Sequence, residues 1–173
     1  ALDKLINYHK VRLILLNNTK VNDKWIDYLD DKKIHYITWG RCDKETSKYS
    51  WIDEDIEFSN NLAVNHLLEK GHREIGYIDS DLKLNYFLLR KKFFVESLKK
   101  NKITVNKEYF INGYRDDKEK TKKNIHDLLL KNKSISALFV SSHLFAMHVI
   151  DACSELNKKI GKDISLISFD SNI

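Results

Sequence analysis

The chain has 173 residues, of which 42% are hydrophobic and 32% are charged, as in an ordinary globular protein with a sizeable core. No apolar run reaches the roughly 20 residues that a membrane-spanning helix needs. The formal net charge is +5, but the lysines are spread over most segments and interleaved with Asp and Glu, which favours solvated faces over a nucleic-acid-binding patch.

In chain order, helices and strands alternate with short connections, which predicts an α/β protein with parallel sheets and right-handed crossovers. The first third predicts a helix over 2–8, a strand over 11–16, a helix over 23–32, a strand over 34–39 and an irregular crossover over 40–55. The rest predicts helices ending at 70 and spanning 87–101, 118–132 and 144–156, with strands at 75–78, 109–111, 137–140 and 164–169.

The joint at residues 58–78 is the clearest signal for this fold class. Five residues recur at helical spacing and predict the core face of the helix: Phe58, Leu62, Ala63, His66 and Leu67. Gly71 can adopt the left-handed conformation that closes a helix. Ile75 to Ile78 is short and apolar, as in a strand covered on both faces.

Polar residues follow the predicted strands, at the edge where ligands bind in parallel α/β sheets. They are Asn17, Asn18, Gly40, Arg41, Asp79, Ser80, Ser141, Ser142, His143 and Asp170. Such side chains suit a neutral polyol, since Asp accepts hydrogen bonds from hydroxyls and Arg donates a fork, while Trp39 and Tyr86 offer ring faces. Ordinary caps and loops would have the same composition, so both interpretations stand.

Signatures of enzymes and cofactors are missing from the sequence, and no cofactor or metal is predicted. There is no phosphate-binding loop, nucleophile elbow or zinc-binding motif. Ser142 and His143 are better explained as a helix cap and a first-turn histidine than as a nucleophile with its base. Cys42 and Cys153 lie far apart, which implies no disulfide and fits the reducing cytoplasm. No helix-turn-helix pattern is visible either.

Several segments together resemble one family. They are Trp51-Ile52-Asp53-Glu54-Asp55, the joint from His66 to Ile75, Arg90 with Phe94, Ser136 to Val140 with Ala146, and Asp163 to Asp170. This combination resembles the lactose-repressor/galactose-repressor family of bacterial transcription regulators over essentially the whole chain. The Trp39-Gly40-Arg41 turn is similar to that of the maltose-repressor-like branch.

The resemblance implies a two-lobed periplasmic-binding-protein-like fold, incomplete at both ends, with parallel sheets flanked by helices. Residues 1–53 would form part of the N-terminal lobe and residues 54–173 most of the C-terminal lobe. It further implies a sugar or sugar-derived effector in the inter-lobe cleft, a homodimer, a cytoplasmic location without membrane contact, and operator DNA bound through a helix-turn-helix domain upstream.

By the same match, the effector-contacting residues are Arg90, Asp170, Arg41, Ser142, Tyr114 and Arg115. Four departures from the family pattern leave the effector open: His143, Phe93, Arg115 and Ser168. If Arg41, Arg90 and Arg115 converged, a phosphorylated ligand would fit. An alternative function is a periplasmic or lipoprotein sugar-binding protein for transport. A third, an α/β enzyme such as a sugar-phosphate hydrolase, lacks any motif.

Overall fold

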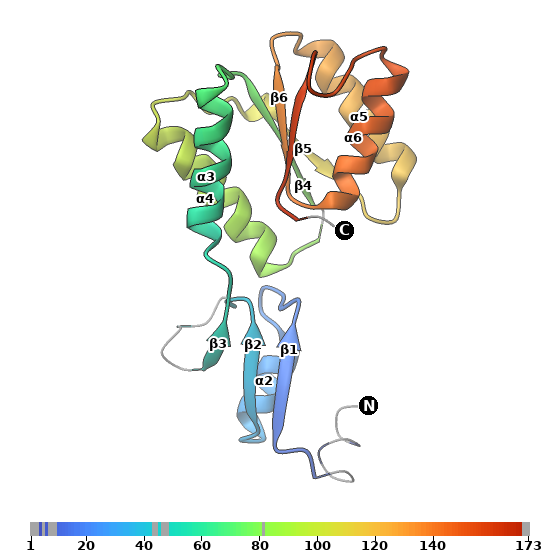
Figure 1. Cartoon of the computed structure of the whole chain (residues 1–173). Coiled ribbons are helices and arrows are strands. Elements are labelled where there is room, and N and C mark those ends of the chain that lie inside the picture. The colour runs from blue at the N-terminus through green and yellow to red at the C-terminus, as the bar shows by residue number, and fades with distance from the viewer. Residues whose placement is uncertain are drawn as a thin grey trace. The chain divides into compact units, whose positions relative to one another are not determined.

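The computed structural model describes residues 10–42, 49–80 and 82–170, together with residues 4, 6 and 45. The chain divides into two compact units (Figure 1), each with its own parallel sheet. Unit 1 comprises Ala1–Asp55 and Lys83–Leu88, and unit 2 comprises Ile56–Leu82 and Leu89–Ile173. The helix expected over 2–8 falls largely outside the described residues. Within the described part, no helix is long and apolar enough to cross a membrane.

Unit 1 is built on three parallel strands in the order β1-β2-β3, with bounds Leu13–Asn17, His35–Trp39 and Ser50–Ile52. The helix α2 (Lys24–Asp31) begins after Asp23, whose carboxylate accepts a hydrogen bond from the Trp25 backbone N–H at 2.9 Å. Ile26 and Leu29 of this helix are completely buried and form the core of the unit with Tyr36. The segment 40–55 was expected to be irregular, and β3 corrects that prediction.

The short segment Lys83–Leu88 also belongs to unit 1. The Asn85 backbone N–H donates to the Thr19 carbonyl at 2.9 Å, and Lys20 forms an antiparallel bridge with Leu84. The Asn85 side chain reinforces this contact by donating to the Lys20 carbonyl at 3.0 Å. The segment is therefore tied to the loop that follows β1.

Unit 2 has a four-stranded, fully parallel sheet in the order β5-β4-β6-β7. The strands are β4 (Ile75–Ser80), β5 (Phe110–Gly113), β6 (Ala137–Val140) and β7 (Ser165–Ser168), and a 3-10 turn, η2 (Lys107–Tyr109), precedes β5. The helices are α3 (Ile56–Glu69), α4 (Asn85–Lys100), α5 (Lys118–Lys131) and α6 (His143–Glu155), and α4 belongs to this unit from Leu89 onward. In Figure 1, α3 and α4 lie on one face of the sheet, and α5 and α6 on the other.

The central strand β4 is buried along its whole length because helices cover both faces. Ile75 and Tyr77 pack toward α3 and α4, whereas Ile78 packs toward α5 and α6. Successive side chains of a strand point to opposite faces, so β4 contributes to two separate cores. The prediction of an α/β fold with parallel sheets is thus confirmed.

The core face expected for α3 is confirmed for Leu67, which is buried, and for Ala63, which packs against the core, but it is wrong for the other three residues. Phe58 and Leu62 are 63% and 61% exposed, and His66 is exposed as well. Besides Leu67, the helix buries Ile56, Asn60 and Val64. Both stripes carry apolar residues at helical spacing, so the periodicity alone did not distinguish the inner face from the outer one.

Candidate ligand-binding site

The carboxyl edge of the sheet in unit 2 brings together side chains that are far apart in the sequence. Because all four strands are parallel, the segments that follow them meet at the same edge. Asp170 follows β7, His143 begins α6 after β6, and Arg90 projects from α4. Contacts within hydrogen-bonding distance join these three residues. They form the candidate site of unit 2.

Arg90 is held in place from three directions. Its Nη1 atom donates to the Ser141 carbonyl at 2.7 Å and lies 3.4 Å from Asp170 Oδ2. The guanidinium stacks over the Phe169 ring, 3.8 Å from its centroid. The side chain is only 8% exposed. Arg90 therefore presents a fixed, largely neutralised charge rather than a mobile cation.

Asp170 bridges Arg90 and the start of α6. Its Oδ1 atom accepts a hydrogen bond from the His143 backbone N–H at 2.6 Å and lies 3.3 Å from His143 Nδ1. The side chain remains 42% exposed. A carboxylate offers about four acceptor positions, so Asp170 has acceptor capacity left for a hydroxyl group from solution.

Ser142 is the N-cap residue of α6, and its side chain makes no capping hydrogen bond. The Asp170 carboxylate takes over that role by receiving the His143 N–H. Ser142 is half-buried at the same edge of the sheet. Its hydroxyl therefore stays available where the family resemblance places an effector contact.

Tyr114 and Arg115 also follow a strand, β5, but other partners hold them. The Tyr114 backbone N–H donates to Thr121 Oγ1 at 2.7 Å, and Lys120 Nζ lies 3.6 Å from the centroid of the Tyr114 ring. Arg115 is exposed in the turn before α5. Among the described contacts, neither Tyr114 nor Arg115 touches Arg90, Asp170 or His143.

Arg41 belongs to unit 1 and is paired there. Its Nε atom lies 3.0 Å from Asp53 Oδ2, and its backbone N–H donates to the same oxygen at 3.2 Å. The guanidinium also lies over the Trp51 ring, 5.6 Å from its centroid. Trp39, at the end of β2, is 62% exposed. The carboxyl edge of unit 1 therefore carries a neutralised arginine over the Trp51 ring and, in addition, the exposed indole of Trp39.

A second ion pair at the edge of unit 2 was missed from the sequence. Lys91 Nζ lies 3.1 Å from Oδ2 of Asp79, which is almost completely buried at the end of β4. Burial raises the pKa of Asp79, and the Lys91 ammonium partly opposes that rise. The same burial, with the Asp79 charge nearby, raises the pKa of Tyr77 well above its ordinary value. Only the strand end at Asp79 was visible in the sequence, because Lys91 looks like any other exposed helical lysine.

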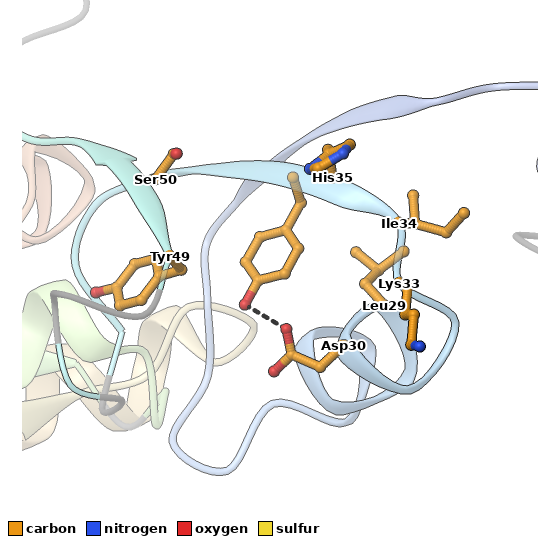
Figure 2. Close-up of a pocket in the computed structure, with 8 residues that line it drawn as sticks. Leu29, Asp30, Lys33, Ile34, His35, Tyr49 and Ser50 are labelled. Carbon is orange, nitrogen blue, oxygen red and sulfur yellow. Dashed lines mark hydrogen bonds between the residues drawn. The ribbon is translucent and has the colours of Figure 1, made fainter.

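A pocket of about 490 Å³ lies in unit 1 (Figure 2). It is at the amino end of β2 and β3, opposite the carboxyl edge where Arg41 lies. The Tyr36 hydroxyl donates there to Asp30 Oδ1 at 2.9 Å. Burial raises the pKa of Tyr49 to about 12, and its hydroxyl accepts a hydrogen bond from the Cys42 N–H at 3.0 Å. None of the predicted site residues lines this pocket, which is lined by Leu29, Asp30, Lys33, Ile34, His35, Tyr36, Tyr49 and Ser50.

Hydrogen bonding to a polar ligand is the chemistry for which the carboxyl edge of unit 2 is suited. The described residues contain no group of three or more His, Cys, Asp or Glu side chains that could hold a metal ion. The His143 ring lies beside the Asp170 carboxylate, with Nδ1 3.3 Å from Oδ1. The arrangement can therefore bind hydroxyl groups.

Comparisons with known proteins agree with this architecture. Residues 64–173 match the family model of the periplasmic binding protein-like domain. The "HTH-type transcriptional repressor PurR" of Yersinia pestis is 29% identical over 91% of the chain, which spans only 46% of that relative's length. This similarity confirms the resemblance to the lactose-repressor/galactose-repressor family.

Solved structures show the same fold at lower sequence identity. A putative transcriptional regulator from Bacillus cereus superposes with a TM-score of 0.85 at 19% identity, covering 99% of this chain and 61% of that one. The transcriptional regulator CelR, solved as a cellobiose complex, gives a TM-score of 0.84 at 19% identity, covering 96% and 52%. In both comparisons, this chain matches only part of the longer chain in the solved structure.

Proposed function

Because this chain belongs to the family of periplasmic binding protein-like domains, and its curated relatives are named as transcriptional repressors, we propose that it is the effector-sensing core of a bacterial transcription regulator. In this proposal residues 1–53 are part of the N-terminal lobe and residues 54–173 are most of the C-terminal lobe. An effector held by contacts from both lobes controls operator binding by a helix-turn-helix domain elsewhere in the full-length protein, which acts as a cytoplasmic homodimer.

The proposed effector is a neutral, polyhydroxylated molecule such as a sugar. The observation that carries this choice is the Arg90–Asp170 pair, in which the guanidinium charge is balanced by a carboxylate that is still 42% exposed. Arg41 is likewise balanced by Asp53. A phosphorylated ligand would have to compete with both carboxylates, whereas a hydroxyl group can donate to Asp170 without breaking either pair. The cellobiose complex of the related CelR supports the same class.

Thermal-shift titration with mono- and disaccharides, sugar phosphates and purines tests the effector class. A ligand at about one hundred times its dissociation constant should stabilise the protein by roughly 2.7 kcal/mol. We expect a neutral sugar to shift the melting temperature of the wild type, and Asp170→Asn to reduce that shift. A shift produced only by sugar phosphates or purines would contradict a neutral sugar.

The matched control for Asp170→Asn is Asp163→Asn. Asp163 accepts a hydrogen bond from the Lys159 backbone N–H at 2.7 Å, so it too is an exposed carboxylate that caps a turn. It precedes β7, whereas Asp170 follows it. Asp163→Asn should leave the ligand response unchanged. An equal loss in both variants would mean that the response tracks stability rather than the site.

A further inference from the structure

A second pocket lies on unit 2, against the face of the sheet that α4 covers, and it uses none of the residues proposed to contact the effector. Its volume is about 590 Å³, within the range of small-molecule sites. It is lined by Lys91, Val95, Lys99, Val105, Lys107 and Phe110. The first three come from one face of α4, at intervals of four residues, and the others from the segment that leads into β5.

The floor of this pocket is apolar and well supported. Phe110 packs against Tyr77 and Phe94, with ring centroids 5.7 and 5.9 Å apart. Val95 and Val105 are half-buried beside it. Because the aromatic rings behind Phe110 belong to the core, the floor is preformed, and a hydrocarbon group placed on it would lose contact with water at little ordering cost.

The rim of the pocket is cationic, and two of its charges are not neutralised. Lys91 is paired with Asp79, but Lys99 and Lys107 form no ion pair with any carboxylate in the described ranges. Of the acidic residues nearest in the sequence, Glu96 lies 4.0 Å from Lys92, and Glu108 forms no ion pair with Lys107 among the described residues. Two ammonium groups beside an apolar floor favour a ligand that is anionic at one end and apolar at the other.

We propose that this pocket binds a free amphipathic carboxylate, with its hydrocarbon body on Val95, Val105 and Phe110 and its carboxylate between Lys99 and Lys107. The occupant is a small molecule rather than an anionic membrane surface, because the apolar area forms a pocket on one side of the sheet and not a protruding patch. The chain would then carry a second sensing site, independent of the candidate site at the carboxyl edge.

Calorimetric and NMR titration of the 173-residue chain with octanoate tests the proposal. Octanol and acetate serve as ligand controls, since one lacks the charge and the other the hydrocarbon body. We expect saturable binding of octanoate alone, with amide shift changes centred on Val95, Val105 and Phe110. All three tryptophans lie in unit 1, so tryptophan fluorescence should not change.

A charge-matched pair of variants separates a specific site from general attraction to a basic protein. Lys99→Gln with Lys107→Gln should weaken octanoate binding by about tenfold or more, since two charge-assisted contacts are lost. Lys100→Gln with Lys123→Gln removes the same charge from exposed positions outside the pocket and should leave the affinity unchanged. Asp170→Asn should have no effect either, which separates this proposal from the sugar site.

Three results would overturn the proposal: no saturable octanoate binding, equal weakening in both double variants, or binding only to vesicles that contain phosphatidylglycerol. The first would mean that the pocket takes no amphipathic carboxylate. The second would indicate a nonspecific electrostatic effect. The third would identify the lysines as a membrane-facing patch. Saturable binding that is lost only in the Lys99 and Lys107 variant supports the site.

Discussion

The carboxylate of Asp170 accepts the backbone N–H of His143 across 2.6 Å, and this bond ties the end of β7 to the start of α6. The second oxygen of the same carboxylate pairs with Arg90. Asp170 therefore has a structural role in addition to the ligand contact that the family resemblance implies. Stability and ligand response must be measured separately for any substitution at this position.

Asp170→Ala should lower the free energy of unfolding of unit 2 by about 1–2 kcal/mol, because the first turn of α6 loses its cap. Asp170→Asn retains an oxygen that can accept the His143 N–H and should cost less. Chemical denaturation, followed by amide hydrogen exchange of α6, measures both variants. If Ala and Asn were equally destabilising, the negative charge of Asp170 beside Arg90 would matter more than the cap.

Arg90→Lys should destabilise unit 2 by roughly 2–3 kcal/mol, although it keeps the positive charge. A lysine ammonium cannot reproduce both the planar stacking on Phe169 and the fixed donor to the buried Ser141 carbonyl. Urea denaturation of the variant and the wild type measures the difference. Lys92→Ala, on an exposed turn of the same helix, provides the control and should change stability by less than about 0.5 kcal/mol. Unchanged stability in Arg90→Lys would show that the charge alone suffices.

Gly113→Ala should destabilise unit 2 by about 1–3 kcal/mol through overpacking. A Cβ atom at Gly113 would lie 2.4 Å from Cδ1 of Phe145, which is buried and has little room to move. Replacing Phe145 with Leu in the same chain should recover part of the loss. Gly71→Ala has no neighbour within 4 Å but a φ of +89°, so its cost comes from the backbone, and Phe145→Leu should not rescue it. Equal rescue of both variants would argue against the steric explanation.

Stability should fall as the pH drops below the ordinary histidine pKa of 6.5, because of His148. Burial and the nearby Lys118 charge lower the pKa of His148, so the unfolded chain takes up a proton before the folded one does. The contribution is complete above pH 6.5 and is lost as the pH falls toward the lowered value. His148→Leu should flatten the difference in unfolding free energy between about pH 8 and about pH 5.5.

Two carboxylates on the same surface titrate in a different range. Hydrogen bonding to Lys118 lowers the pKa of Asp151, and hydrogen bonding to Lys122 lowers that of Glu155. Their stabilising contribution is therefore present above their ordinary pKa values of 3.8 and 4.5 and is lost only in stronger acid. A wild-type curve that stayed flat down to pH 5 would rule out the proposed role of His148.

Much of the fold could be predicted because the signals were local. The alternation of helices and strands and the glycine at residue 71 follow from short stretches of sequence, and Gly71 does adopt a left-handed φ of +89°. The strand β3 was missed because it has only three residues, all exposed, in a polar segment. Short strands of that kind acquire their structure from pairing with a neighbour, here β2.

The candidate site was harder to predict, since its contacts are not local. Arg90 and Asp170 are 80 positions apart, and the packing of α4 on the sheet together with the pairing of β6 with β7 brings them together. The sequence pointed to both through a family resemblance and placed Asp170 at a strand end. It could not indicate that Asp170 caps α6, that Arg41 is neutralised by Asp53, or that Lys91 reaches Asp79.

Phe169 connects the candidate site to the hydrophobic interior of unit 2. One side of its ring carries the Arg90 guanidinium, and it stacks at 6.4 Å on Phe139, which in turn contacts Tyr77 and Phe94. A substitution that loosens this aromatic stack would make the position of the Arg90 guanidinium less fixed, without changing any residue of the candidate site. Substitutions in the interior would therefore change the affinity for the proposed effector indirectly. Such substitutions can accumulate while the residues of the candidate site stay the same.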